Sequence, residues 1–185
     1  MSDSAEARPR LSEGLVQVYT GNGKGKTTAA LGVVLRASAH GLRTHIVYFL
    51  KGVPRWGAEE MAALERLPGV SLTRFGMPRF MLGPGGTDDD RAQAAAALAE
   101  AQRAVAGGDY DVVVLDEVNV AVAKGLLSAQ DVLAVVAAKP KHVELILTGR
   151  GAPPELIQHA DLVTEMVEIK HPYQRGVLAR AGIDY

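Results

Sequence analysis

One stretch of this 185-residue chain decides its fold: Gly21-Asn22-Gly23-Lys24-Gly25-Lys26-Thr27-Thr28. It follows a short apolar run, Leu15–Tyr19, and leads into a run rich in alanine and leucine, Thr27–Ala39. A strand, a glycine-rich turn and a helix in this order are typical of a phosphate-binding loop. The glycines let successive backbone amides point inward as an anion-binding nest, and the start of the helix also favours negative charge.

The loop is a variant of the usual pattern, in which a glycine and four spacers precede Gly-Lys-Ser/Thr. Here Thr20 occupies the first position and Gly21 comes one residue late. We expect Lys26 to place its charge against the phosphates of a nucleotide and Thr27 to offer its hydroxyl to magnesium. A glycine-rich turn without a ligand would explain the glycines but not Lys-Thr at this spacing. The predicted nucleotide-binding residues are Gly21, Asn22, Gly23, Lys24, Gly25, Lys26, Thr27 and Thr28.

Apolar runs and helical stretches alternate along the rest of the chain. This alternation predicts an α/β domain, with a mostly parallel sheet and helices on both faces. We expect residues 1–13 to form a flexible arm and residues 14–185 to form one domain. The predicted strands are Leu15–Tyr19, His45–Leu50, Val70–Phe75, Val112–Asp116, Val143–Thr148 and Leu162–Ile169, and the predicted helices are Thr27–Ala39, Ala58–Leu67, Asp88–Ala106, Ser128–Ala138 and Pro153–Ala160.

Charged residues follow several of the predicted strands. Asp116 and Glu117 end one of them, and in phosphate-loop proteins an acid in this place holds magnesium. Spacing does not choose between the two acids. Lys51 and Arg150 follow two other strands, and ligands of open α/β sheets lie outside these carboxyl ends. The sequence alone favours neither of two interpretations for these cations, namely residues of the binding site or exposed charges beside turns.

Composition narrows the function classes. The net charge of −1 does not suggest a broad nucleic-acid surface, and the absence of cysteine excludes disulfides and thiolate metal sites. Met1–Arg10 does not resemble a signal peptide, and no apolar run approaches the ~20 residues that span a bilayer. We therefore expect a cytoplasmic protein without a nucleic-acid or membrane partner.

At this point the chain resembles the phosphate-loop type of corrinoid adenosyltransferase, which acts on cobalamin and its precursors. The variant loop is itself characteristic of that family. The resemblance runs from about Leu15 to the last residue. It is carried by Thr20–Ala30, Arg36 with His40-Gly41, Phe49 with Lys51-Gly52, Val113–Glu117, Thr148–Gly151, Lys170-His171 and Ala181–Tyr185.

The resemblance implies a three-layer P-loop NTPase fold of the RecA-like kind. It also implies transfer of the 5′-deoxyadenosyl group of ATP to cobalt(I) of a corrinoid, with triphosphate released and ATP held in a reversed sense. Cobalt(I) is already a strong nucleophile, so that the enzyme's tasks are orientation and stabilisation of the leaving group. The implied catalytic residues are Lys26 and Glu117, magnesium lies near Thr27, Glu117 and Asp116, and Arg36 and Arg150 join the nucleotide-binding residues.

The family often carries Gly-Phe-Thr-Trp in the loop after the third strand, where the aromatic residues act on the cobalt ligand. This chain has Arg79-Phe80-Met81-Leu82 there, which makes Phe80 the expected corrinoid-binding residue and replaces the tryptophan with Leu82. The resemblance further implies a homodimer, a reductase such as a flavoprotein as electron donor, and an N-terminal arm that folds over a site.

Two other functions fit a phosphate loop. A RecA-like ATPase switch would release ADP and phosphate under the control of a macromolecule, and a small-molecule kinase would release ADP and a phosphorylated acceptor. The near-neutral charge and the lack of a second domain weigh against the switch.

Overall fold

The computed structural model describes residues 10–52, 58–79 and 85–184. Its centre is one six-stranded sheet with the strand order β3-β2-β4-β5-β1-β6, in which every pair of neighbours is parallel. The strands are β1 (Val16–Thr20), β2 (Thr44–Tyr48), β3 (Val70–Arg74), β4 (Val112–Asp116), β5 (Glu144–Thr148) and β6 (Leu162–Glu165). The parallel sheet predicted from the apolar runs is confirmed.

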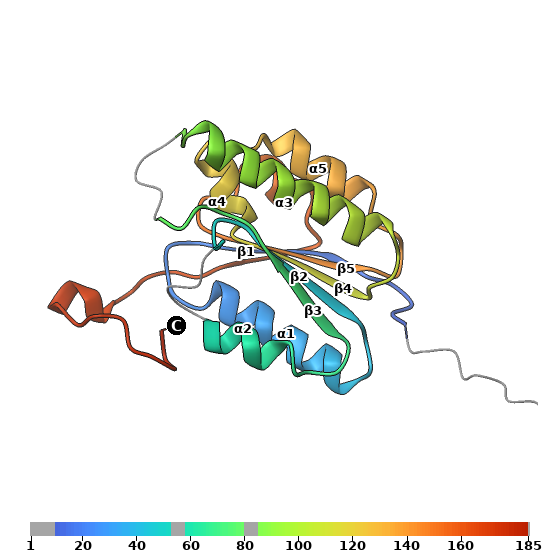
Figure 1. Ribbon diagram of the computed structural model, residues 1–185, viewed down its shortest axis with the longest axis horizontal. Helices are drawn as coiled ribbons and strands as arrows, with labels where there is room; N and C mark the ends of the chain where they lie inside the picture. The colour runs from blue at the N-terminus through green and yellow to red at the C-terminus, as the bar shows by residue number, and fades with distance from the viewer. Residues whose placement is uncertain (1–9, 53–57, 80–84, 185) are drawn as a thin grey trace, which may run out of the picture.

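Helices cover both faces of the sheet, as Figure 1 shows, with α1 and α2 below it and α3, α4 and α5 above it. The three-layer α/β architecture is thereby confirmed. The helices are α1 (Lys26–Ala39), α2 (Ala58–Leu64), α3 (Asp88–Ala106), α4 (Val118–Ala123), α5 (Ala129–Ala137) and α6 (Pro154–His159), and a 3-10 turn, η1, spans Pro172–Arg175. No helix in the described ranges is both long and apolar enough to span a bilayer.

The core consists of two layers, one on each side of the sheet. Every residue of β2, β4 and β5 is buried, which is why these runs are apolar on both faces. One layer joins Val113, Leu115 and the buried alanines of α3. The other joins Ile46, Val114 and the inner face of α1. This rigid centre supports the strand ends from which the loops project.

Several elements differ from the prediction: α2 ends at Leu64 rather than Leu67, β2 ends at Tyr48 rather than Leu50, and η1 was not predicted. Two further differences have a clear physical reason. The last strand ends at Glu165 rather than Ile169, because Glu165 pairs with Thr20 and the neighbouring strand β1 ends there. Helix α4 was not predicted. It begins directly after Glu117, whose backbone is left-handed with φ of 64°, so that a short apolar helix follows the strand without a spacer.

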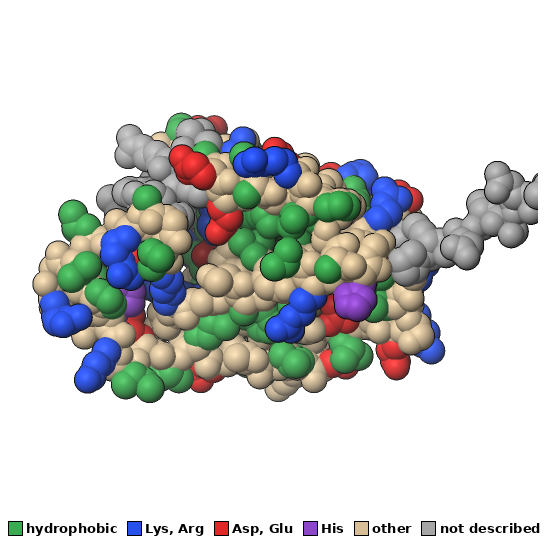
Figure 2. All heavy atoms as spheres, turned by 90° about the horizontal axis from the view of Figure 1, so that it is seen from below, with side chains coloured by type: hydrophobic (Ala, Val, Ile, Leu, Met, Phe, Trp, Pro, Cys, Tyr) green, Lys and Arg blue, Asp and Glu red, His purple; other side chains and the backbone are tan. Residues whose placement is uncertain are grey.

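Residues 166–184 leave the sheet and run along its carboxyl end (Figure 1). This C-terminal segment carries apolar side chains that are largely exposed, among them Ile169 at 86 %, Leu178 at 76 % and Tyr173 at 71 %. Figure 2 shows apolar and basic side chains standing side by side at that end of the molecule. Exposed apolar side chains gathered in this way are typical of an interaction surface.

Candidate functional site

The phosphate loop connects β1 to α1 at the carboxyl end of the sheet. Gly21 and Gly25 have φ of 91° and 119°, a backbone region that favours glycine. A Cβ on Gly21 would lie 2.4 Å from the carbonyl oxygen of Met166, so that glycine is also required by the close approach of the segment that follows β6. Gly23 N donates to the same Met166 oxygen at 2.7 Å. The loop is therefore braced from outside by the chain that follows β6.

Lys26, the first residue of α1, folds back over the loop. Its Nζ donates hydrogen bonds to the carbonyl oxygens of Gly21 at 2.7 Å and Gly23 at 2.6 Å. Burial lowers the pKa of Lys26, the charge of Arg150 lowers it further, and Glu117 opposes both. The ammonium group is thus held over the nest, where it would face an anion that enters.

Asp116 is the centre of a hydrogen-bonded cluster under the loop, and its side chain is only 1 % exposed. Oδ1 accepts hydrogen bonds from the hydroxyls of Thr27 at 2.8 Å and Thr148 at 2.7 Å. Oδ2 accepts one from Nζ of Lys51 at 2.5 Å. The ends of β2, β4 and β5 and the start of α1 therefore meet at one carboxylate.

Glu117 lies beside this cluster, and its backbone N donates to Oγ1 of Thr148 at 3.0 Å. Burial raises the pKa of the Glu117 carboxyl, and the neighbouring charge of Asp116 raises it further, against the attraction of Lys51. A carboxylate in such surroundings gains most from an added cation.

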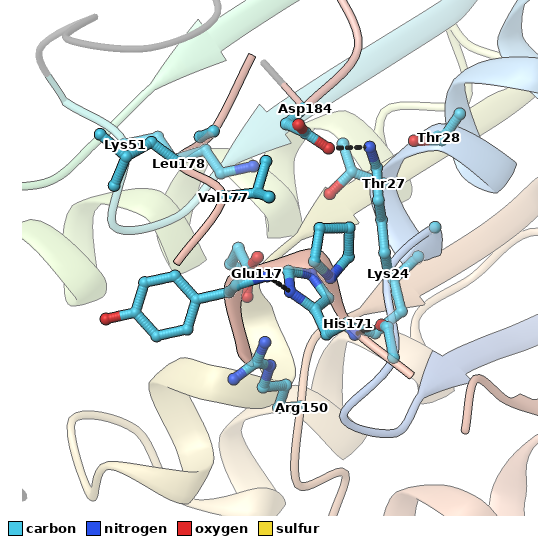
Figure 3. A pocket seen from close by; sticks show the side chains of 16 residues that line it. Lys24, Thr27, Thr28, Lys51, Glu117, Arg150, His171, Val177, Leu178 and Asp184 are labelled. Atoms are coloured by element: carbon cyan, nitrogen blue, oxygen red, sulfur yellow. Dashed lines mark hydrogen bonds and ion pairs between the residues drawn. The ribbon is translucent and has the colours of Figure 1, made fainter. Parts of the chain in front are cut away.

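A cavity of about 390 Å³ opens above these residues, within the size range of small-ligand sites. The phosphate loop forms one wall and the C-terminal segment the opposite wall, as Figure 3 shows. Lys24 Nζ bridges the two walls by donating to the carboxylate of Asp184. The lining includes Gly23, Lys24, Gly25, Lys26, Thr27, Thr28, Lys51, Glu117, Arg150, His171, Tyr173, Leu178 and Asp184.

Most of the residues predicted for nucleotide binding meet at this cavity, Arg150 among them. Asn22 is exposed and does not line it. Arg36 lies further along α1 and lines a different hollow together with Leu15 and Glu144, so the chain does not bring it to the phosphate loop. The place of Phe80 falls outside the described residues, as does that of Leu82.

Two groups of lining residues were not selected from the sequence. For Lys51, the sequence left a place in the site and an exposed turn equally open, and the structure shows an ion pair between Lys51 and Asp116. The wall formed by His171, Tyr173 and Leu178 had no signal of its own, because no local pattern tells a chain that returns across a site from one that leaves it. Only the family resemblance, carried there by Lys170-His171 and Ala181–Tyr185, pointed to that end of the chain.

The donors around Asp116 suit magnesium. Thr27, Asp116 and Glu117 offer hard oxygen atoms next to a phosphate nest, which is the chemistry that this ion prefers. Among the described residues there is no group of three or more His, Cys, Asp or Glu that would hold a metal by itself.

A second cavity lies on the far side of Lys51 and Glu117. Its other walls come from Leu50, two residues after β2, from Met77 and Arg79, from Asp90 of α3, and from Val120 and Lys124 in the α4 region. Its lining includes Arg79, the residue that precedes Phe80 in the sequence.

The comparisons with known proteins agree with this geometry. The family model described as ATP:corrinoid adenosyltransferase BtuR/CobO/CobP matches residues 12–185. The chain is 37 % identical over 183 residues to a corrinoid adenosyltransferase of Pseudomonas aeruginosa, covering 99 % of this chain and 89 % of that one. It is also 37 % identical over 183 residues to the corrinoid adenosyltransferase CobA of Salmonella typhimurium, covering 99 % and 91 %.

Among solved structures, a KaiC-like protein of Pyrococcus horikoshii has a similar fold. It superimposes with a TM-score of 0.56 at 18 % identity, over 86 % of this chain and 75 % of that one. At this identity the likeness concerns the fold alone, and it supports the RecA-like arrangement of the sheet.

Proposed function

Because the chain belongs to the BtuR/CobO/CobP family of ATP:corrinoid adenosyltransferases, we propose that its phosphate-loop cavity grips the triphosphate of ATP as a leaving group. The protein is a transferase of cobalamin biosynthesis that uses ATP and a corrinoid. The electron pair of cobalt(I) forms the new bond to the 5′ carbon, and the bond between that carbon and its oxygen breaks, with its electrons leaving on triphosphate.

The observation that carries the proposal is the charge arrangement around the loop. Lys24, Lys26, Lys51 and Arg150 all line the cavity, so that four cations converge on the place where negative charge must develop. The nucleophile needs no proton removed, and we assign no general base. Glu117 has the role of a magnesium ligand together with Thr27 and Asp116.

Magnesium, when bound, would neutralise phosphate charge and help to orient the chain of phosphates. The residues that would hold it are Thr27, Asp116 and Glu117. The Asp116 carboxylate also accepts hydrogen bonds from the Thr27 hydroxyl and the Lys51 ammonium.

We propose the second cavity, on the other side of Lys51 and Glu117, as the side from which the corrinoid approaches. Its lining includes Arg79, the sequence neighbour of Phe80, which the family resemblance assigns to the corrinoid. Its lining combines the apolar side chains of Leu50, Met77 and Val120 with cations, which suits a large macrocycle with polar substituents.

We also propose that the protein acts as a homodimer in the cytoplasm and receives electrons from a separate reductase, for example a flavoprotein. Strand β6 lies at the edge of the sheet, and its Leu162 and Val163 are each 41 % exposed, which leaves an apolar edge for a second copy. The lack of cysteine fits a reducing compartment. Light scattering of the purified protein tests the dimer directly.

The decisive experiment incubates the protein with ATP, magnesium and a chemically reduced corrinoid. We expect the spectrum of the alkylated corrinoid and inorganic triphosphate in equal amounts. Release of ADP without alkylation would instead support the ATPase switch, or the kinase if an acceptor is phosphorylated. Lys26→Ala should abolish turnover, because it removes the charge over the nest, and full activity of this variant would remove the loop from the mechanism.

A further inference from the structure

The two cavities at the carboxyl end of the sheet share part of one wall. Of the residues that line the phosphate-loop cavity and those that line the second cavity, Lys51 and Glu117 belong to both sets. Lys24, Lys26 and Arg150 line the first cavity, and Arg79 and Lys124 line the second. Among the cations of the described residues, Lys51 therefore stands where the two spaces adjoin.

The backbone around Lys51 is built to put it there. Leu50 adopts a left-handed conformation with φ of 60°, which is uncommon for a branched residue and turns the chain sharply after β2. Lys51 N donates to the carbonyl oxygen of Phe75 at 2.9 Å. A Cβ on Gly52 would lie 1.7 Å from the oxygen of Gly76, so that only glycine allows the two loops to approach.

The side chain of Lys51 is held by an ion pair but remains partly exposed. Its Nζ donates to Asp116 Oδ2 at 2.5 Å and lies 5.4 Å from the centre of the Tyr48 ring. The side chain is nevertheless 34 % exposed, and Figure 3 shows it at the edge of the phosphate-loop cavity. An ammonium group has three N–H donors, so that one contact with Asp116 leaves donors for an incoming oxygen atom.

We propose that Lys51 is a further catalytic residue of adenosyl transfer, whose ammonium group stabilises the oxygen that leaves the 5′ carbon. This inference rests on the proposed function. In an attack by cobalt(I), the reacting carbon must lie where the nucleotide and the corrinoid meet, and the departing oxygen lies next to it. Lys26 and Arg150 are assigned to the remaining phosphates, because they line only the nucleotide side.

The charge balance supports Lys51 rather than its neighbour. As the carbon–oxygen bond breaks, its electron pair stays on the α-phosphate oxygen and the negative charge there increases. Glu117, the other residue shared by the two cavities, is an acid and would repel that charge. A cation that already lies at the junction needs no reorganisation when the charge develops, which is the condition under which such groups are most effective.

The test compares Lys51→Met, Lys51→Arg and Lys141→Met. The last variant removes the same charge from an exposed position before β5, at the opposite end of the sheet. Single-turnover transfer is followed by the corrinoid spectrum with corrinoid reduced in advance and ATP saturating, and the Kd of ATP is measured by calorimetry. We expect Lys51→Met to slow transfer by about 100-fold, the usual effect of removing one group that stabilises a transition-state oxyanion. Its ATP Kd should stay within about threefold, as a group that acts in the transition state predicts.

Lys51→Arg should recover part of the rate and Lys141→Met all of it. A purely structural role through Asp116 is tested by Lys51→Met in an Asp116→Asn background. If Lys51 acts on the leaving oxygen, the double variant is still much slower than Asp116→Asn alone. Equal rates for those two, or a Lys51→Met rate close to that of the wild type, would overturn the inference. A wild-type protein that releases ADP instead of triphosphate would overturn the proposed function itself.

Discussion

Lys24 and Asp184 form an ion pair that ties the phosphate loop to the penultimate residue of the chain. Nζ of Lys24 also donates to the carbonyl oxygen of Ile183 at 2.5 Å, while Arg180 Nε donates to the other carboxylate oxygen of Asp184 at 2.9 Å. The hydrogen bonds from Arg180 and then that from Lys24 hold the pKa of the Asp184 carboxyl well below its usual range. The Asp184 carboxylate is thus paired with Lys24 of the phosphate loop, beside the place where the triphosphate would bind.

Replacement of Asp184 tests whether it competes with the nucleotide. We expect Asp184→Asn to tighten the binding of ATP, because it removes a negative charge that lines the cavity and engages Lys24. Calorimetric titration measures the Kd, and limited trypsin digestion after Arg180 should become faster as the segment loosens. Glu65→Gln, an exposed change at the end of α2, serves as the control. Weaker ATP binding by Asp184→Asn would mean that the carboxylate contributes to nucleotide binding.

Asp116→Asn tests the magnesium site. The amide keeps the shape of the side chain but loses the charge that an ion would need, so the Kd of ATP measured with magnesium should rise by about tenfold or more, as perturbed metal sites commonly show. In the presence of a chelator, wild type and variant should bind ATP alike. A loss of the same size under both conditions would show that Asp116 acts on the loop and not on a metal ion.

Gly52→Ala tests the contact that positions Lys51. The added methyl would collide with the oxygen of Gly76, and we expect a loss of about 1–3 kcal/mol in the free energy of unfolding, the range for overpacking. Urea denaturation measures it. The matched control is Gly32→Ala in the middle of α1, where a Cβ meets nothing within 4 Å. That change should stabilise the protein by about 0.5–1 kcal/mol through helix propensity. Similar values for the two variants would refute the contact.

His45 makes stability depend on pH. It is 3 % exposed, contacts Glu100 with Nε2 at 3.0 Å, and stacks on Tyr110. Burial lowers the pKa of His45 more than the charge of Glu100 raises it. The pKa of Glu100 is itself lowered, first by its hydrogen bond with Arg103, so that its carboxylate stays ionised through mildly acidic pH.

The folded protein therefore keeps His45 neutral while the unfolded chain takes up a proton as the pH falls below about 6.5. We expect the free energy of unfolding to decrease from pH 7.5 to pH 5.5, and His45→Gln to flatten that dependence. Urea denaturation at both pH values measures the difference. An equally steep decrease in the variant would assign the effect to other groups.

The sequence predicted those features that depend only on residues close together along the chain. The glycines of the loop, Lys26-Thr27 and the apolar strand before them predict a nest, because each feature acts within a few residues along the chain. Helix α4 was missed because the left-handed turn at Glu117 occupies a single residue and carries no glycine. The last strand is shorter than predicted, because its end depends on the pairing with β1, which is remote in sequence.

The sequence by itself determined the family, the sheet and the cations available to a triphosphate, since apolar alternation and the loop pattern are properties of neighbouring residues. Only the tertiary structure decided which of those cations share a site. In the structure, Lys51 pairs with Asp116 between the two cavities, whereas Arg36 lines a different hollow. Asp184 contacts Lys24, from which it is separated by 160 positions in the sequence. Distances of this kind depend on the register of the strands and the path of the loops, and the packing of the whole sheet sets both.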